Sequence, residues 1–124
     1  MKDNKQQIFN ELKKALAPVA KKLDVRNDTD KRYDLFGKKT VTLYNKVHEG
    51  FYFGSIIIQK NYVVFYFFCI YSHPKEFADI PEILRKCLKG KSCFHITKLD
   101  KEVFKAIKEM VKKGYNLYKK EGLI

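Results

Sequence analysis

The sequence is poor in the features that mark secreted, membrane-spanning and metal-binding proteins. Its three cysteines, Cys69, Cys87 and Cys93, cannot all pair within one chain and lack the spacing of a zinc finger or a thioredoxin motif. A disulfide framework is not expected, and we predict a reducing, cytoplasmic setting. The longest apolar run, residues 62–71, has 10 residues, whereas a membrane helix needs about 20. The charged N-terminus does not have the form of a secretory signal, so we expect a soluble chain without membrane contact.

Arginine is scarce although the chain is strongly basic. The formal net charge is +12, from 26 basic and 14 acidic residues, and only Arg26, Arg32 and Arg85 are arginines. A large positive charge favours contact with polyanions such as nucleic acid. Arginine, however, is the residue preferred for bidentate contacts with bases and phosphates. The charge therefore leaves two interpretations open, a polyanion partner and a solubilising lysine surface.

The first 40 residues predict one helix followed by a polar segment. Apolar residues recur at helical spacing in one stripe, formed by Ile8, Leu12, Leu16, Val19 and Leu23. Pro18 interrupts the stripe, which predicts a kink or a break near Ala17. We expect residues 24–39 to be extended chain with turns, and short strands at residues 23–25 and 40–44. The four aspartates between residues 24 and 34 lack the glycine and the terminal glutamate of a calcium loop.

The clearest predicted element is an aromatic β-hairpin. Two β-rich runs, residues 53–59 and 62–71, flank the dipeptide Lys60-Asn61, and such spacing is typical of a hairpin. Asn61 tolerates the positive φ that tight hairpin turns require. Because the second run is apolar at nearly every position, we expect it to be a central antiparallel strand covered on both faces and ended by Pro74.

The C-terminal part predicts a short helix, a strand and a long closing helix. Asp79 caps the expected short helix, which Gly90 ends, and Cys87 is a small core residue on it. A strand follows at residues 92–97. The closing helix begins after Asp100, an N-cap within a hydrophobic staple, and ends at about Glu121. Its expected inner face is Val103, Phe104, Ile107, Met110, Val111 and Tyr118. These elements predict a single α+β domain, residues 1–124, with the N- and C-terminal helices packed on an antiparallel sheet.

The strand at residues 92–97 places a cysteine beside a histidine. Side chains alternate along a strand, so Cys93 and His95 share the face opposite the core. A structural zinc site needs four ligands and a catalytic site three, and no spacing brings His48, His73 or Cys87 to this pair. A Cys–His nucleophile would also need an oxyanion donor and an orienting group, and the sequence indicates neither.

We therefore expect no metal, no cofactor and no catalytic residue. The candidate ligand-binding residues are Tyr62, Tyr66, Cys93 and His95, which lie on the aromatic hairpin and the strand after it.

Five lysines of the closing helix form a second candidate surface. At 100° per residue they fall on one narrow stripe, which we call the lysine ridge: Lys101, Lys105, Lys108, Lys112 and Lys119. The stripe is typical of a solvated helix face, and it would also serve as a docking ridge for phosphates. Lysine contacts to phosphates carry no base information, so nucleic-acid binding there would be nonspecific.

Two groups of residues, on the hairpin and on the strand after it, form a distinctive pattern: Ile58, Lys60, Tyr62, Val63, Phe65 and Tyr71, and then Gly90, Lys91, Ser92, Cys93 and Phe94. With this pattern the chain resembles the YdhG-like family of small domains of unknown function over roughly residues 53–120. This chain has His95 where the family pattern has asparagine, which counts against an obligatory histidine ligand. It also has Tyr66 where the pattern has histidine, and Cys69 where it has proline.

One branch of that family is described as frataxin-like iron chaperones, and the resemblance implies this activity as one possibility. Iron chaperoning needs a carboxylate-rich surface, because hard cations prefer oxygen ligands, and the net charge of +12 disfavours it. We predict a binding module for a small ligand or a protein partner, and not an enzyme. The alternative is a nonspecific polyanion binder that uses the lysine ridge.

Overall fold

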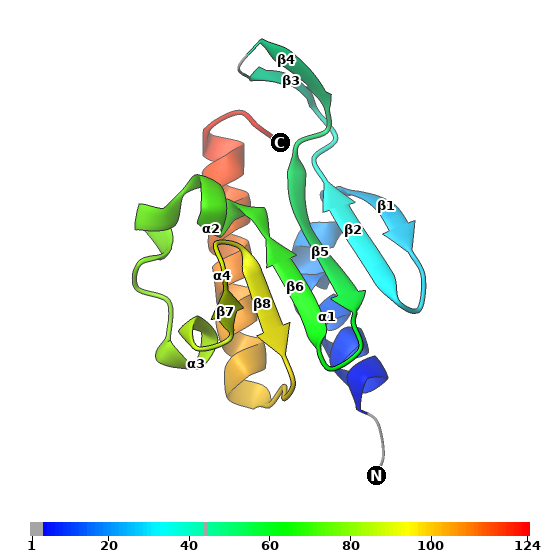
Figure 1. Ribbon diagram of the computed structural model, residues 1–124. Coiled ribbons are helices and arrows are strands. Elements are labelled where there is room, and N and C mark those ends of the chain that lie inside the picture. Colours follow the sequence, from blue (N-terminus) through cyan, green and yellow to red (C-terminus); the bar gives the residue numbers. More distant parts are fainter. Residues whose placement is uncertain (1–3, 44) are drawn as a thin grey trace.

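A six-stranded antiparallel sheet with two long helices on it forms the body of the protein (Figure 1). The computed structural model describes residues 4–43 and 45–124. The strands lie in the spatial order β1 (Asp24–Asp28), β2 (Arg32–Phe36), β5 (Tyr52–Ile58), β6 (Val63–Phe67), β8 (Cys93–Ile96) and β7 (Leu88–Lys89). A separate hairpin joins β3 (Thr40–Leu43) and β4 (Lys46–Glu49). The predicted α+β class is confirmed.

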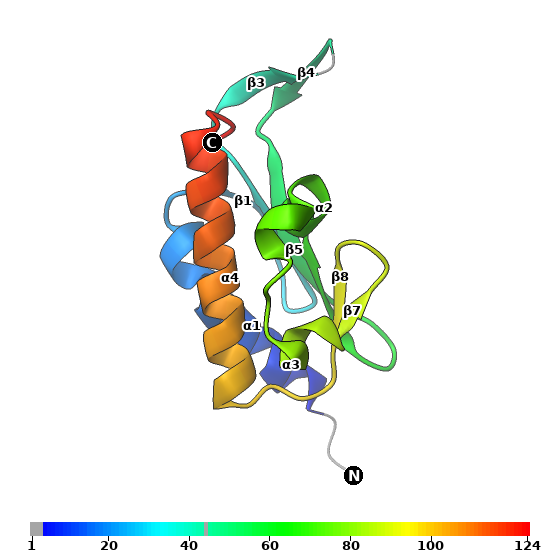
Figure 2. The same ribbon diagram turned by 90° about the vertical axis from the view of Figure 1, so that its left-hand side faces the viewer.

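Both long helices cover the same face of the sheet. Helices α1 (Lys5–Ala20) and α4 (Lys101–Lys120) pack against each other, and α1 also contacts β5 and β6. Figure 2 shows this helical layer on one side of the sheet and, in the described part of the chain, no helix on the other. In β6, Val63, Phe65 and Phe67 are fully buried in the core, whereas Val64 and Tyr66 face away from it. Val64 is nevertheless only 2% exposed, so this part of the strand is buried on both faces as predicted, although no helix of the described chain covers the second face. We call that second side the open sheet face.

The aromatic run at residues 62–71 is not one strand. Strand β6 ends at Phe67, and α2 (Phe68–Ser72) and a 3₁₀ helix, η1 (Pro74–Phe77), follow it. Pairing with β5 ends at Gly54 and Phe67, and pairing with β8 ends at Tyr66. Beyond Phe67 the strand would leave backbone groups unpaired on the β8 side, whereas a helical turn satisfies its own backbone groups and buries Cys69 and Ile70.

Helix α1 runs through Pro18 without the predicted break. The apolar stripe of this helix is buried as predicted. Pro18 is exposed and lies in the last turn, and the carbonyl that loses its donor belongs to exposed Lys14. Water can satisfy that carbonyl, so a proline at this position does not end the helix.

The polar segment 24–39 contains two strands. Strand β1 confirms in part the short strand predicted at residues 23–25 and extends it to Asp28, whereas β2 replaces part of the extended chain with turns that we expected. Strand β2 pairs with β5 and buries Tyr33 and Leu35 in the core. The strand predicted at residues 40–44 is confirmed as β3 for its described residues. The β5–β6 turn closes through Gln59 and Tyr62, 2.9 Å from N to O. Asn61 does not take the expected positive φ, which is found instead at Asn45 in the β3–β4 turn.

The predicted short helix is present only as α3 (Glu82–Arg85). Its N-cap is Pro81 and not Asp79 as we expected. Cys87 is only half-buried, and its thiol donates to the carbonyl of Ile83 at 3.4 Å. The closing helix agrees with the prediction: the Asp100 carboxylate accepts a 3.0 Å hydrogen bond from Val103 N, and Gly122 follows the last turn with φ of 77°. Within the described residues, no helix has the length and apolar content needed to cross a bilayer.

Candidate binding site on the open sheet face

The sheet brings together the four candidate ligand-binding residues. Tyr66 on β6 pairs directly with Cys93 on β8, and Val64 pairs with His95. The Tyr62 ring stacks on the His95 imidazole, with ring centroids 3.9 Å apart and planes 15° apart. All four candidate side chains are half-buried. They form one aromatic and thiol cluster on the open sheet face.

A polar network lies next to this cluster on the open sheet face, and we did not predict it from the sequence. Cross-strand pairing places Asp34 beside Ser55, and Ser55 beside Tyr66. Asp34 is buried, with only 4% of the residue exposed. Its Oδ2 accepts hydrogen bonds from Arg32 Nε at 2.9 Å and from Asn27 Nδ2 at 2.5 Å. The Arg32 side chain is 54% exposed, so a charged guanidinium is accessible to a ligand at this face.

Two groups of this network have shifted pKa values. Burial alone would raise the pKa of Asp34, but interactions with Ser55, Arg32 and Asn27 and the positive charge of Arg32 lower it overall. Oδ1 of the same carboxylate has no hydrogen-bond partner within the described chain. Burial raises the pKa of Tyr52 to about 12, and its hydroxyl lies 2.6 Å from Ser55 Oγ. At neutral pH the face therefore holds a buried, ionised carboxylate, with Oδ1 unpaired in the described chain, beside the neutral phenol of Tyr52.

Replacing Asp34 by asparagine is expected to destabilise the fold by about 1–3 kcal/mol at neutral pH, because Arg32 and Asn27 lose a charged acceptor. A carboxylate with a lowered folded-state pKa stabilises the fold above its ordinary pKa, and this contribution is lost as the pH falls through the lowered value. Urea unfolding at about pH 7 and about pH 2 measures both effects.

The difference between Asp34→Asn and the parent protein should shrink at the acidic pH. Asp30→Asn, at an exposed residue of the β1–β2 turn, is the matched control and should change stability little. Equal stability of Asp34→Asn and the parent at both pH values would contradict the network described above.

The other potential metal ligands do not join the open sheet face. His48 lies on β4, His73 lies between α2 and η1, and the Cys87 thiol points to Ile83. In the parts of the chain that the structure describes, no three His, Cys, Asp or Glu side chains converge as a metal site would require. The absence of a bound metal stays a prediction, which elemental analysis of protein purified without chelators tests.

The lysine ridge lies on the opposite side of the molecule, on the outer face of α4. All five of its lysines are exposed, as expected from the apolar inner face of the helix. Helix α1 and the turn after it add exposed Lys14, Lys21 and Lys22 to the same helical layer. Lys22 Nζ lies 5.2 Å from the Tyr115 ring centroid. This contact connects the lysines next to α1 with the helix that carries the lysine ridge.

Comparisons with known proteins identify no relative: no family model matches the chain, and no curated protein or solved structure gives a significant match. The resemblance to the YdhG-like family thus stays a proposal that rests on the motif residues of β5, β6 and β8.

Proposed function

We propose that this protein is a non-enzymatic binding module whose open sheet face holds a small ligand or a segment of a protein partner. The observation that carries the proposal is the ion pair between buried Asp34 and exposed Arg32, on a face that no helix of the described chain covers. A buried charge, even when paired, is weak support for stability, since apolar residues of similar size often serve as well. Its placement beside Tyr66 and the Tyr62–His95 stack supports a role in recognition.

The composition of the face also favours binding. Tyrosine and arginine are the residues that most often dominate binding energies at interfaces, and here Arg32, Tyr62 and Tyr66 are all accessible in part. A planar ligand can stack against the aromatic pair, while the exposed guanidinium of Arg32 offers hydrogen-bond donors and a positive charge.

The same geometry disfavours a cysteine nucleophile. Cys93 and His95 are two residues apart on β8, a rise of about 6.6 Å. The His95 ring stacks on Tyr62, and among the described residues no hydrogen bond joins this ring to the Cys93 thiol. A general base must lie within hydrogen-bond reach of the group it deprotonates, which supports the non-enzymatic proposal.

A fragment screen followed by amide chemical shifts in NMR tests the proposed function. The probes are small aromatic amides and carboxylates that can both stack and hydrogen-bond. We expect the largest shifts in residues 62–66 and 93–95. Shifts confined to other surfaces, or none at millimolar probe, would refute the open sheet face as the binding site.

The alternative function is nonspecific binding of nucleic acid by the lysine ridge, favoured by its five exposed lysines. Each phosphate contact changes the slope of log affinity against log salt by about 0.7 to 0.9. Changing Lys105, Lys108 and Lys112 to glutamine is therefore expected to weaken binding of random-sequence DNA or RNA and to reduce the slope by about two to three. Fluorescence anisotropy at several salt concentrations measures both.

A control with Lys31, Lys60 and Lys89 changed to glutamine removes the same charge from exposed positions outside the helices. Equal weakening in both triple variants would rule out the ridge as a specific surface, and no binding by the parent at low salt would remove the alternative. An iron-chaperone role rests on the family resemblance alone. The acidic residues of β1 and β2 could supply oxygen ligands, but the net charge of +12 disfavours this role.

A further inference from the structure

A groove of about 1140 Å³ lies beside α2 and shares none of its lining residues with the open sheet face. We call it the α2 groove. Its walls come from α2 and η1, with contributions from β4, α3, β7 and the end of α4. Its apolar lining is Phe51, Phe68, Ile70, Phe77, Leu88 and Leu123. Tyr71, a large side chain that is 51% exposed, lies along the same groove.

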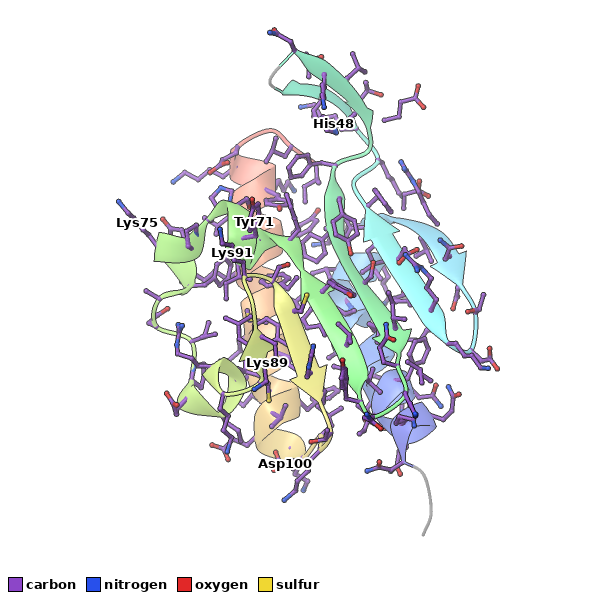
Figure 3. The ribbon with its side chains drawn as sticks, viewed as in Figure 1. His48, Tyr71, Lys75, Lys89, Lys91 and Asp100 are labelled. Atoms are coloured by element: carbon purple, nitrogen blue, oxygen red, sulfur yellow. The ribbon has the colours of Figure 1, made fainter. Side chains whose placement is uncertain are left out.

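The α2 groove is elongated. His48 and Lys91 both line it, and Figure 3 shows His48 at the β3–β4 end of the molecule, well apart from Lys91 and Tyr71, which lie close together. An extended apolar lining of this kind fits a chain better than a compact ring.

Two cations line the groove without an acidic partner. Lys91 Nζ lies 5.7 Å from the Tyr71 ring centroid. One terminal nitrogen of Arg85 donates to the carbonyls of Phe77 and Ala78, both at 3.1 Å, which fixes the guanidinium at the groove. Within the described chain neither cation has a carboxylate within ion-pair distance.

The single carboxylate among the described lining residues, Glu121, is already engaged. His73 Nε2 lies 2.9 and 2.8 Å from its two oxygens, a geometry in which the ring N–H donates to the carboxylate. His73 Nδ1 lies 2.7 Å from Ser72 Oγ, so both ring nitrogens are occupied. The groove therefore combines an apolar lining with an uncompensated positive charge.

We infer that the α2 groove binds a free carboxylate with an unbranched apolar chain, that is, a fatty-acid-like anion. Lys91 and Arg85 attract the head group, and the chain lies along the apolar residues of α2 and η1. The groove volume lies slightly above the range of about 300–1,000 Å³ that is usual for ligand pockets, which leaves room for a long chain. This second site does not depend on the proposed function of the open sheet face.

Calorimetric titration with octanoate, decanoate and dodecanoate, each below its critical micelle concentration, tests whether the apolar lining of the groove binds the chain of the ligand. Each buried methylene should raise the affinity about fourfold. Decanol, which has the decanoate chain length without the charge, should bind about three- to fivefold more weakly than decanoate. No binding of dodecanoate by the parent protein, affinity independent of chain length, or equal affinity for decanol and decanoate would each overturn the inference.

Paired variants test the cations. Lys91→Gln combined with Arg85→Gln should reduce decanoate affinity at least about threefold and leave decanol affinity unchanged. The control, Lys75→Gln with Lys89→Gln, removes the same charge from exposed lysines that do not line the groove and that Figure 3 shows away from Tyr71. An equal loss in the control would overturn the inference.

Arg85 also holds backbone carbonyls, so its loss could unfold the region. Lys91→Gln alone keeps those hydrogen bonds and should show the same direction of change. Decanoate should change the amide chemical shifts of α2, η1 and β7, whereas the small aromatic fragments that bind the open sheet face should change those of β6 and β8. Either proposed site can therefore be refuted without affecting the proposal for the other.

Discussion

Replacing Phe67 by alanine is expected to lower the free energy of unfolding by about 3–5 kcal/mol. Phe67 is fully buried, and its ring centroid lies 5.8 Å from that of Phe53 and 5.4 Å from that of Phe77. The substitution removes buried apolar surface and leaves a cavity that the surrounding rings cannot fill. Chemical denaturation followed by circular dichroism measures the loss.

Two aromatic positions nearby serve as controls for this prediction. Tyr71→Ala removes a ring that is half-exposed and should cost less than about 1 kcal/mol. Tyr66→Ala, on the open sheet face, should also cost much less than Phe67→Ala. A shift of β6 by one residue would exchange the faces of Tyr66 and Phe67. A larger loss for Tyr66→Ala than for Phe67→Ala would therefore contradict both the register and the position of Tyr66 in the proposed site.

Replacing Gly114 by alanine is expected to destabilise the protein by about 1–3 kcal/mol, as overpacking of a core does. A Cβ at this position of α4 would lie 2.6 Å from Phe67 Cζ and 2.8 Å from Cys69 Sγ, both of them buried. Helix propensity acts in the opposite direction, since alanine is better than glycine in a helix by about 1 kcal/mol. We expect the close contact between α4 and the end of β6 to outweigh the gain in helix propensity, so that the net change in stability is a loss.

Asn116→Ala tests the propensity term alone, because Asn116 is exposed on the same helix. It should leave stability unchanged or raise it by a few tenths of a kcal/mol. Combining Gly114→Ala with Phe67→Leu, which shortens the side chain in contact, should cost less than the sum of the two single changes. Thermal and urea unfolding of the four variants measures these differences. Gly114→Ala as stable as the parent would show that α4 does not approach Phe67 this closely.

Elements that depend on local signals were predictable from the sequence. The Asp100 cap and the Gly122 end of α4 follow from interactions within a few residues. The alternation in β8, with Phe94 and Ile96 inward and Cys93 outward, follows from the period of a strand. For the same reason the sequence placed Cys93 and His95 together.

Features that depend on pairing between distant residues were not predictable. Strand β2 is polar at Arg32 and Asp34, and its identity as a strand follows from pairing with β5, whose paired residues lie 16 to 25 positions further along the chain. The alternation of Tyr33 and Leu35 with those charged residues is the signal that could have indicated a half-buried strand. Because Asp34, Ser55 and Tyr66 meet only across the sheet, the polar half of the candidate site required the structure.

The aromatic run was misread for a related reason. Composition at residues 62–71 is as suitable for a strand as for a buried helix, and strand length is limited by the partners available on each side. Pairing of β6 with β5 ends at Phe67 and pairing with β8 ends at Tyr66. The chain then turns into α2, and this turn creates the α2 groove beside the sheet.

The measurement that tests the central claim most directly is the affinity of the best-binding fragment for Tyr66→Ala and for Tyr115→Ala. Both variants remove one half-buried tyrosine, the first from the open sheet face and the second from α4. If the open sheet face is the binding site, Tyr66→Ala should lose about tenfold or more in affinity, with its fold retained, and Tyr115→Ala should bind as the parent does. Unchanged affinity in a folded Tyr66→Ala variant, or an equal loss in Tyr115→Ala, would contradict the claim.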